Sequence, residues 1–168
     1  MPSSPSSPAA GAITAWAAGL LRVRWLVRAP IGLYRAHLGF LFGSRLLMLE
    51  HTGRKSGTRR YVVLEVVGHP RPGTYVVASG FGDRAQWFRN VGANPHVRVY
   101  AGGRRPAPAT ARRLTSGETA AALAAYAAAH PRGWAALRPV FEATLGTRIT
   151  ERETSLPMIA LELAGSSG

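Results

Sequence analysis

Apolar residues near the start of the chain recur at alternating intervals of three and four, the spacing of one face of an α-helix. The residues on this face are Ile13, Trp16, Leu20, Val23 and Val27. Pro30 is expected to end the helix, because the residue before a proline is pushed out of the α region. A second, shorter helical pattern precedes Gly43. The pattern therefore predicts two helices before residue 44.

Beyond these helices the pattern changes to short apolar runs of the length of β-strands. The predicted strands cover residues 45–51, 61–67, 74–79, 97–100, 107–113 and 156–163. Thr115 and Glu118 have the spacing of a capping box and predict a helix that runs to about Ala129, and another helix is predicted over residues 132–145. Strands at short intervals without βαβ alternation favour a small barrel over a parallel sheet. The expected fold class is α+β, mainly β.

The domain organisation follows from length and composition. A chain of 168 residues is the size of one domain with a substantial core. Residues 1–11 are rich in Ser and Pro and predict a disordered tail, residues 12–43 form the helical segment, and residues 44–165 form the barrel domain. A secretory signal is not expected, because the arginines follow the first apolar stretch instead of preceding it. The N-terminal helices either pack on the barrel or lie on a membrane surface with their arginines at anionic lipid.

The charge of the chain points to an anionic partner. The formal net charge is +13, and all but one of the 21 basic residues are arginine, so the single Lys55 stands out. Such a chain attracts phosphates, polycarboxylates, nucleic acid or acidic lipid. No recognition-helix, RNP-like or zinc-finger pattern accompanies the charge, so nucleic acid is not an expected partner. The absence of cysteine excludes disulfides, thiolate metal sites and cysteine nucleophiles.

Several familiar motifs are excluded by their spacing. Residues 80–85 match GxGxxA after a strand, but no acidic residue between Asp83 and Glu118 is available for a nucleotide ribose. A phosphate-binding Walker loop needs a glycine before its lysine, and Lys55 follows Arg54. The five histidines have no metal-ligand spacing, so no metal site is expected.

A glycine-bounded cationic turn, GRKSGTRR at residues 53–60, has the composition of an anion-binding site. Glycines let backbone amides approach an anion closely, and consecutive amides can form a concave anion site. Arg54 or Arg60 can hold a phosphate or carboxylate with two hydrogen bonds, and Lys55 adds a point charge. Taken alone, the stretch is equally compatible with a solvated basic hairpin.

A second stretch, VVASGFGDRAQWFRNVGANPHVRV at residues 76–99, predicts a strand, a glycine turn, a short helix, a turn and another strand. Asp83 is expected to cap the helix, whose N-terminus beside flexible glycines is a further anion site. Trp87 and Phe88 offer a flat apolar surface next to two polar residues. A flat aromatic ligand with an anionic tail would use both stretches, although Trp87 could equally be a core residue.

Together with PIGLYRAHLGFLFGSRLLMLEHTG, which precedes them, the two stretches resemble the deazaflavin-dependent nitroreductase family. Members of this family bind coenzyme F-420 on a split β-barrel related to the FMN-binding barrels. The resemblance covers residues 29–113, is looser over 114–155 and returns at 156–161. It implies an FMN-binding-type split β-barrel with N-terminal and peripheral helices.

The resemblance also implies a cofactor site. Lys55 and Arg60 would hold the phosphate and acidic tail of the coenzyme, helped by Arg54, Ser56 and the Gly57 backbone. The residues expected around the deazaflavin ring are Ala78, Ser79, Gly80, Trp87, Phe88, Arg89 and Asn90. No residue is assigned a catalytic role.

The expected function is that of an oxidoreductase that passes hydride from coenzyme F-420 to a small lipophilic electrophile, such as a quinone, an enone or a nitro compound. The tyrosines of the nitroimidazole-reducing members have no clear counterpart, since only Tyr126 and Trp134 lie near that region. Alternatives are an FMN enzyme on the same barrel and a non-catalytic basic protein that binds membranes or anions. A homodimer, a cytoplasmic location and membrane contact through the N-terminal helices are further expectations.

Overall fold

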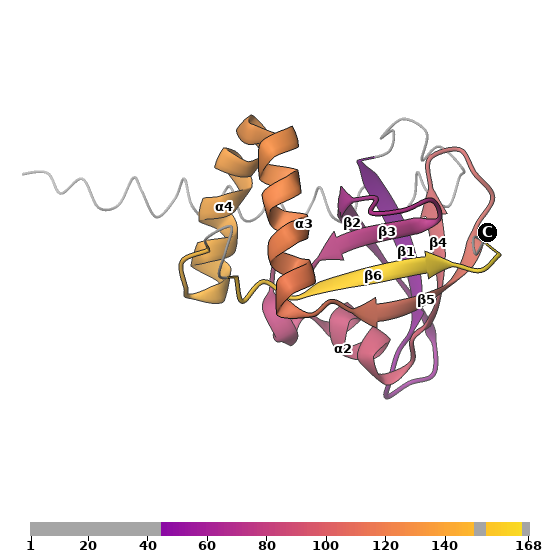
Figure 1. Ribbon diagram of the computed structural model, residues 1–168. Helices are drawn as coiled ribbons and strands as arrows, with labels where there is room; N and C mark the ends of the chain where they lie inside the picture. The colour runs from indigo at the N-terminus through magenta and orange to yellow at the C-terminus, as the bar shows by residue number, and fades with distance from the viewer. Residues whose placement is uncertain (1–44, 150–153, 166–168) are drawn as a thin grey trace, which may run out of the picture.

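The computed structural model describes residues 45–149 and 154–165 (Figure 1). The tail predicted at 1–11 and the helical segment predicted at 12–43 lie outside the described residues, and with them the predicted membrane contact. Within the described ranges, no helix combines the length and the apolar content needed to span a bilayer.

Six antiparallel strands form a closed barrel in the order β1-β2-β3-β6-β5-β4. The strands are β1 (Leu46–Thr52), β2 (Arg59–Gly68), β3 (Thr74–Ala78), β4 (His96–Ala101), β5 (Ala107–Arg113) and β6 (Met158–Leu163). All six lie where the apolar runs predicted strands, with ends that differ by at most two residues. The predicted fold class, a mainly β barrel with peripheral helices, is confirmed.

The interior of the barrel is formed by every second side chain along the strands. Leu47 of β1 faces Leu64 of β2, and Leu49 faces Val62. Because successive side chains of a strand point to opposite faces, every second residue of these strands enters the core. Buried residues of that interior core include Leu47, Leu49, Leu64, Val66, Val77, Val97, Val99 and Leu161. The residues between them face outward.

A short helix, α2 (Gln86–Ala93), lies across one end of the barrel (Figure 1). Phe88 and Val91 of this helix belong to the same buried cluster as the strand residues, so α2 closes that end of the core. The prediction that Asp83 caps α2 is wrong. Asp83 lies one turn earlier, in the 3-10 helix η2 (Gly82–Arg84), and the N-cap of α2 is Ala85, which has no side-chain acceptor.

Helices α3 (Ser116–Ala129) and α4 (Pro131–Leu145) stand side by side next to the barrel (Figure 1). Leu123, Tyr126 and Trp134 pack with Val76 and Met158 in a second buried cluster, between the helices and the outer face of the strands. The α3 stretch from 119 to 129 is otherwise built of small residues, mostly alanine, so its two large side chains, Leu123 and Tyr126, define the face that meets the barrel.

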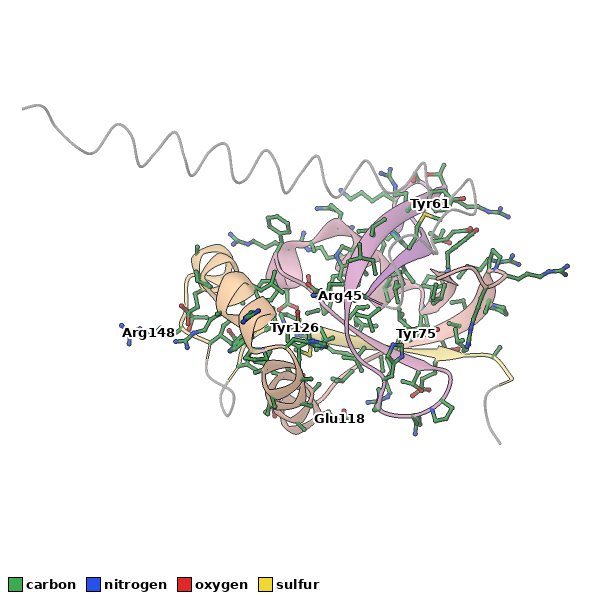
Figure 2. All side chains as sticks on the ribbon, turned by 90° about the horizontal axis from the view of Figure 1, so that it is seen from above. Arg45, Tyr61, Tyr75, Glu118, Tyr126 and Arg148 are labelled. Carbon is green, nitrogen blue, oxygen red and sulfur yellow. The ribbon has the colours of Figure 1, made fainter. Side chains whose placement is uncertain are left out.

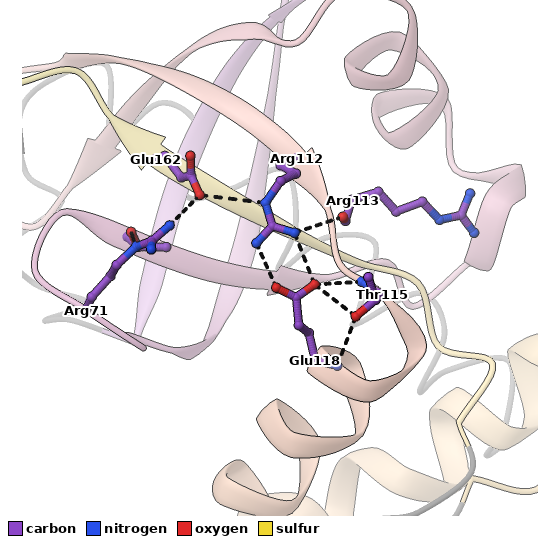
Figure 3. Close-up of polar contacts among 7 residues, drawn as sticks. Arg71, Arg112, Arg113, Thr115, Glu118 and Glu162 are labelled. Atoms are coloured by element: carbon purple, nitrogen blue, oxygen red, sulfur yellow. Dashed lines mark hydrogen bonds and ion pairs between the residues drawn. The ribbon is translucent and has the colours of Figure 1, made fainter. Parts of the chain in front are cut away.

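A polar network fixes the beginning of α3 (Figure 3). Thr115 and Glu118 form the predicted capping box, and Arg112 donates two hydrogen bonds to the Glu118 carboxylate, at 3.0 and 2.9 Å. The Arg112 hydrogen bonds, helped by those from Thr115, lower the pKa of Glu118 to about 2. Arg112 also lies 3.7 Å from Glu162 of β6, which pairs with Arg71 at 2.7 Å. The network thus ties α3 to β5, β6 and the β2–β3 turn.

Candidate functional site

A cavity of about 540 Å³ opens where β2, the turn after β3, α2, α3 and α4 meet. This volume is within the range of small-molecule and cofactor sites. Its polar lining residues are His51, Arg60, Tyr61, Glu65, Gln86, Asn90 and Tyr126. Its larger apolar ones include Phe81, Trp87, Leu123, Trp134, Leu137, Phe141, Leu156 and Met158. The cavity therefore has a polar side near β1, β2 and α2 and an apolar side near α3 and α4.

The cationic turn connects β1 to β2 and borders the polar side. The Gly53 amide donates to the Thr58 carbonyl, and the Gly57 amide donates to the Gly53 carbonyl, both at 2.8 Å. Gly57 has a φ of 65°, which only glycine adopts readily. A side chain at Gly53 would place its Cβ 2.8 Å from the Arg60 Nε atom. Glycine at this position thus lets Arg60 fold over the turn while it also lines the cavity.

Arg54 joins the turn to α2. Its NH1 atom donates to Gln86 Oε1 and to Asn90 Oδ1, each at 3.0 Å, and its backbone amide donates to the same Asn90 oxygen at 3.2 Å. The two stretches that the sequence singled out therefore meet in space. Arg54 is the residue that holds them together, so its guanidinium is engaged within the protein.

Asn90 connects Arg54 to a buried histidine, His51. Since Asn90 Oδ1 accepts from Arg54, its Nδ2 atom faces the Nδ1 atom of His51, at 3.3 Å. An amide nitrogen only donates, so His51 Nδ1 accepts and the ring is neutral. Burial, followed by the positive charge of Arg60, lowers the pKa of His51, which keeps the ring neutral at physiological pH. The polar side of the cavity is thus a fixed hydrogen-bonded wall.

Two cations of the turn are uncommitted. Lys55 and Arg60 are exposed, and neither side chain forms a hydrogen bond or ion pair within the part of the chain that the structure describes. Ser56, by contrast, shares a 2.8 Å hydrogen bond with the Thr58 hydroxyl. Lys55 and Arg60 are therefore the groups of the turn that remain available for an anionic ligand.

The structure separates the residues expected around the coenzyme ring into two groups. Ala78, Gly80, Trp87 and Asn90 line the cavity. The others lie elsewhere. Ser79 is fully buried and donates its hydroxyl to the Gly82 carbonyl at 2.7 Å.

Phe88 and Arg89 are also placed away from the cavity lining. Phe88 is buried in the barrel core, with the Arg113 guanidinium 5.2 Å from its ring centroid. Arg89 is exposed, and its Nε atom donates to the Asp83 carbonyl at 2.9 Å. On a helix, residues adjacent in sequence point about 100° apart, so Trp87 and Phe88 cannot both face the same ligand.

A tyrosine and a glutamate form the polar contact on the helix side of the cavity. Tyr126 of α3 donates to Glu65 Oε1 of β2 at 2.6 Å, and Arg45 lies 3.6 Å from the same oxygen. Figure 2 shows Tyr126 turned toward the barrel with Arg45 near it. Burial, followed by the hydrogen bond to Glu65, raises the pKa of Tyr126 to about 12, so the phenol stays protonated at neutral pH.

Sequence reasoning missed several cavity residues: His51, Glu65, Phe81, Tyr126, Leu137 and Phe141. One signal was available for Tyr126, which with Leu123 is a large side chain at i,i+3 spacing in an alanine-rich helix. His51 and Glu65 carried no such signal, because their role depends on where α2 and α3 pack.

This fold and site define a class of protein. A closed six-stranded antiparallel barrel, flanked by helices and bordered by free cations at an aromatic-lined cavity, is a split β-barrel of the cofactor-binding kind.

The sequence model of the F420H(2)-dependent quinone reductase family matches residues 27–138, and the chain belongs to that family. The protein is accordingly an oxidoreductase that depends on coenzyme F-420. A comparison with curated proteins gave no match.

Solved structures agree with this assignment. A structure of an F420-H2 dependent reductase, FDR-A, is 27% identical with a TM-score of 0.51, over 70% of this chain and 94% of the other. A second structure, described as a domain-swapped dimer, has the same identity and TM-score and covers 70% of this chain and 80% of the other. A protein of unknown function from Agrobacterium tumefaciens shares the fold at 18% identity, with a TM-score of 0.53 over 82% of this chain and 56% of the other.

The residues present fit the coenzyme that the family uses. Lys55 and Arg60 supply free positive charge for an anionic tail, and Arg60 reaches from the turn to the cavity. Ala78, Gly80 and Trp87 line the same cavity, so two small residues and one aromatic side chain are available to a ring system. Arg60 connects the cationic turn to the cavity, because it belongs to the turn and also lines the cavity.

Proposed function

We propose that this protein uses coenzyme F-420 to reduce a lipophilic, planar acceptor of the quinone class. One observation carries the proposal: two uncommitted cations, Lys55 and Arg60, border a cavity whose far side is apolar. Lys55 and Arg60 hold the anionic part of the coenzyme, and Ala78, Gly80 and Trp87 lie against its ring. When bound in its reduced form, the coenzyme supplies a hydride.

The residues of the chain position the reactants and exclude water. Arg54, held by Gln86 and Asn90, keeps the cationic turn against α2, so the two cations are prepared before the coenzyme arrives. Positioning of this kind removes an entropic cost from the reaction step.

The apolar side of the cavity favours a lipophilic acceptor. Side chains such as Leu123, Leu137 and Phe141 offer no charge or hydrogen bond to a polar substrate. The protonated Tyr126 donates its one hydroxyl hydrogen to Glu65, and we assign this pair the role of fixing α3 against β2, so that the apolar side of the cavity is held in place for the acceptor.

Fluorescence titration tests the cofactor site. Replacing Lys55 and Arg60 together by alanine should raise the Kd for coenzyme F-420 by one to several orders of magnitude, since each charged hydrogen bond contributes roughly 1.5–3 kcal/mol. FMN, titrated in parallel, should bind more weakly than coenzyme F-420. An unchanged Kd in the double variant would exclude these two cations as the site.

A matched control is available at the opposite end of the barrel. Arg104 and Arg105 are exposed in the β4–β5 turn, and antiparallel pairing of Leu47 with Ala101 places that turn away from residues 53–58. Replacing both by alanine removes the same charge, and should leave the Kd within about twofold if long-range attraction is a minor contribution.

Two further proposals concern partners. The relative described as a domain-swapped dimer supports a homodimer. Light scattering would distinguish the 17.9 kDa chain from a particle of twice that mass. Peripheral membrane contact is proposed for residues 12–43, and deletion of residues 1–28 should then reduce co-sedimentation with anionic vesicles without changing coenzyme affinity.

A further inference from the structure

Phe81 is the one large apolar side chain that the described ranges leave exposed, with 52% of its surface accessible. A single exposed phenylalanine needs no explanation by itself. This one, however, lies at the cavity, in the loop between β3 and α2, and lines it together with Ala78 and Gly80. Its chain neighbours Asp83 and Arg84 are exposed and charged, so Phe81 does not continue into a larger apolar patch.

The backbone around Phe81 is a closed β-turn. The Gly82 amide donates to the Ser79 carbonyl at 2.9 Å, and the Ser79 hydroxyl donates to the Gly82 carbonyl at 2.7 Å. Phe81 has φ −99° and ψ 16°, close to the third position of a type I turn. The Ser79 amide is itself bound to the Pro157 carbonyl at 2.8 Å, which anchors the turn to the chain segment before β6.

The two glycines beside Phe81 allow this turn to pack closely against α4. A Cβ atom at Gly80 would lie 3.0 Å from the Phe141 ring, and one at Gly82 would lie 2.9 Å from Leu145. Gly82 also has a φ of 60°, which disfavours other residues. Because the turn is fixed on its α4 side, the backbone of Phe81 is held at the cavity before any ligand binds.

We propose that Phe81 is a specificity-determining residue, whose exposed ring packs on the flat face of an aromatic acceptor at the mouth of the cavity. The proposal rests on the acceptor class proposed above. An aromatic ring on a fixed backbone gains dispersion and stacking contacts with a planar ligand. Little conformational entropy is lost, because only the side-chain torsions have to be ordered. A non-planar acceptor would gain much less from the same ring.

The test combines steady-state kinetics with direct binding. The probes are menadione, a planar naphthoquinone, and cyclohexenone, a non-planar enone. Phe81→Ala should raise the KM for menadione about tenfold, the size expected for one aromatic contact, with little change in kcat. Phe81→Trp should restore a low KM, while KM for cyclohexenone changes less than about twofold in either variant.

Menadione binding without turnover gives an independent readout. Quenching of tryptophan fluorescence, to which the cavity residues Trp87 and Trp134 contribute, should report a Kd that rises about tenfold in Phe81→Ala. The Kd for coenzyme F-420 should stay within about twofold in the same variant.

The outcomes separate this proposal from the function on which it rests. If menadione binds equally to the wild type and Phe81→Ala, or binds to neither, Phe81 does not recognise the acceptor. If the Kd for coenzyme F-420 rises instead, Phe81 belongs to the coenzyme subsite and the proposal is also overturned. If the wild type binds menadione through Phe81 but reduces no quinone, the proposed function fails while the role of Phe81 stands.

Discussion

Two tyrosine–glutamate pairs in this protein have nearly the same chemistry and different surroundings. Tyr126 donates to Glu65 at 2.6 Å, and Tyr100 donates to Glu50 at 2.7 Å. Each carboxylate has an arginine nitrogen 3.6 Å away, and each tyrosine has its pKa raised to about 12, first by burial and then by the glutamate.

The pairs differ in what they connect. Tyr100 and Glu50 lie on the neighbouring strands β4 and β1, where the register places Tyr100 opposite Met48. Tyr126 and Glu65 join α3 to β2 and line the cavity. The two tyrosine pKa values are therefore too similar to show which pair serves the candidate site, whereas position relative to the cavity separates the pairs.

The largest expected difference between the two pairs is in their contribution to the free energy of unfolding. The Glu50 side chain is 12% exposed and that of Glu65 is 29% exposed. Glu50→Ala should lower the free energy of unfolding by about 2 kcal/mol, because the hydrogen bond to the less exposed carboxylate is better shielded from water, and Glu65→Ala should cost about half as much. Urea denaturation of the two variants measures this, and equal losses would contradict the ranking by exposure of the two carboxylates.

Activity should rank the pairs in the opposite order. Tyr126→Phe is expected to lower kcat/KM for a quinone about tenfold, since it removes the hydrogen bond to Glu65 that fixes α3 and the apolar side of the cavity. Tyr100→Phe is the matched control and should leave kcat/KM within about twofold. Similar losses in both variants would indicate that the effect reports folding and not the site.

The smallest effect is the response to alkaline pH. Because both tyrosine pKa values are raised, each pair contributes stability that is present below about 10 and is lost as the pH rises through about 12. The ultraviolet absorbance of phenolate should show this late ionisation, and each Tyr→Phe variant should remove one tyrosine from it. A variant that leaves the high-pH titration unchanged would show that its tyrosine ionises elsewhere.

Most of the barrel could be predicted from local pattern. The β5 strand agrees with its prediction at both ends, and the capping box at Thr115 and Glu118 places the start of α3 correctly. These features depend on residues close in sequence. The error at Asp83 arose because the chain makes a separate 3-10 turn before α2, and the Ser79 and Gly82 contacts that hold this turn are not visible in residue periodicity.

Only one wall of the candidate site was predicted from the sequence, the wall formed by the cationic turn and α2. The cationic turn and the α2 stretch are local motifs, and the Arg54 contacts join them as the hypothesis required. The other wall comes from α3 and α4, whose side chains reach the cavity through tertiary packing alone. Phe88 shows the same limit, because its neighbour Trp87 lines the cavity while Phe88 enters the core.

The place of β6 between β3 and β5 has a consequence for how the protein is made. Both neighbouring strands are synthesised long before β6 and keep an unpaired edge until it emerges from the ribosome. Leu156 and Met158, which line the candidate cavity, arrive with the same segment. The cavity is therefore completed late in synthesis, and a nascent chain that stalls before this strand would expose two unpaired strand edges to its neighbours.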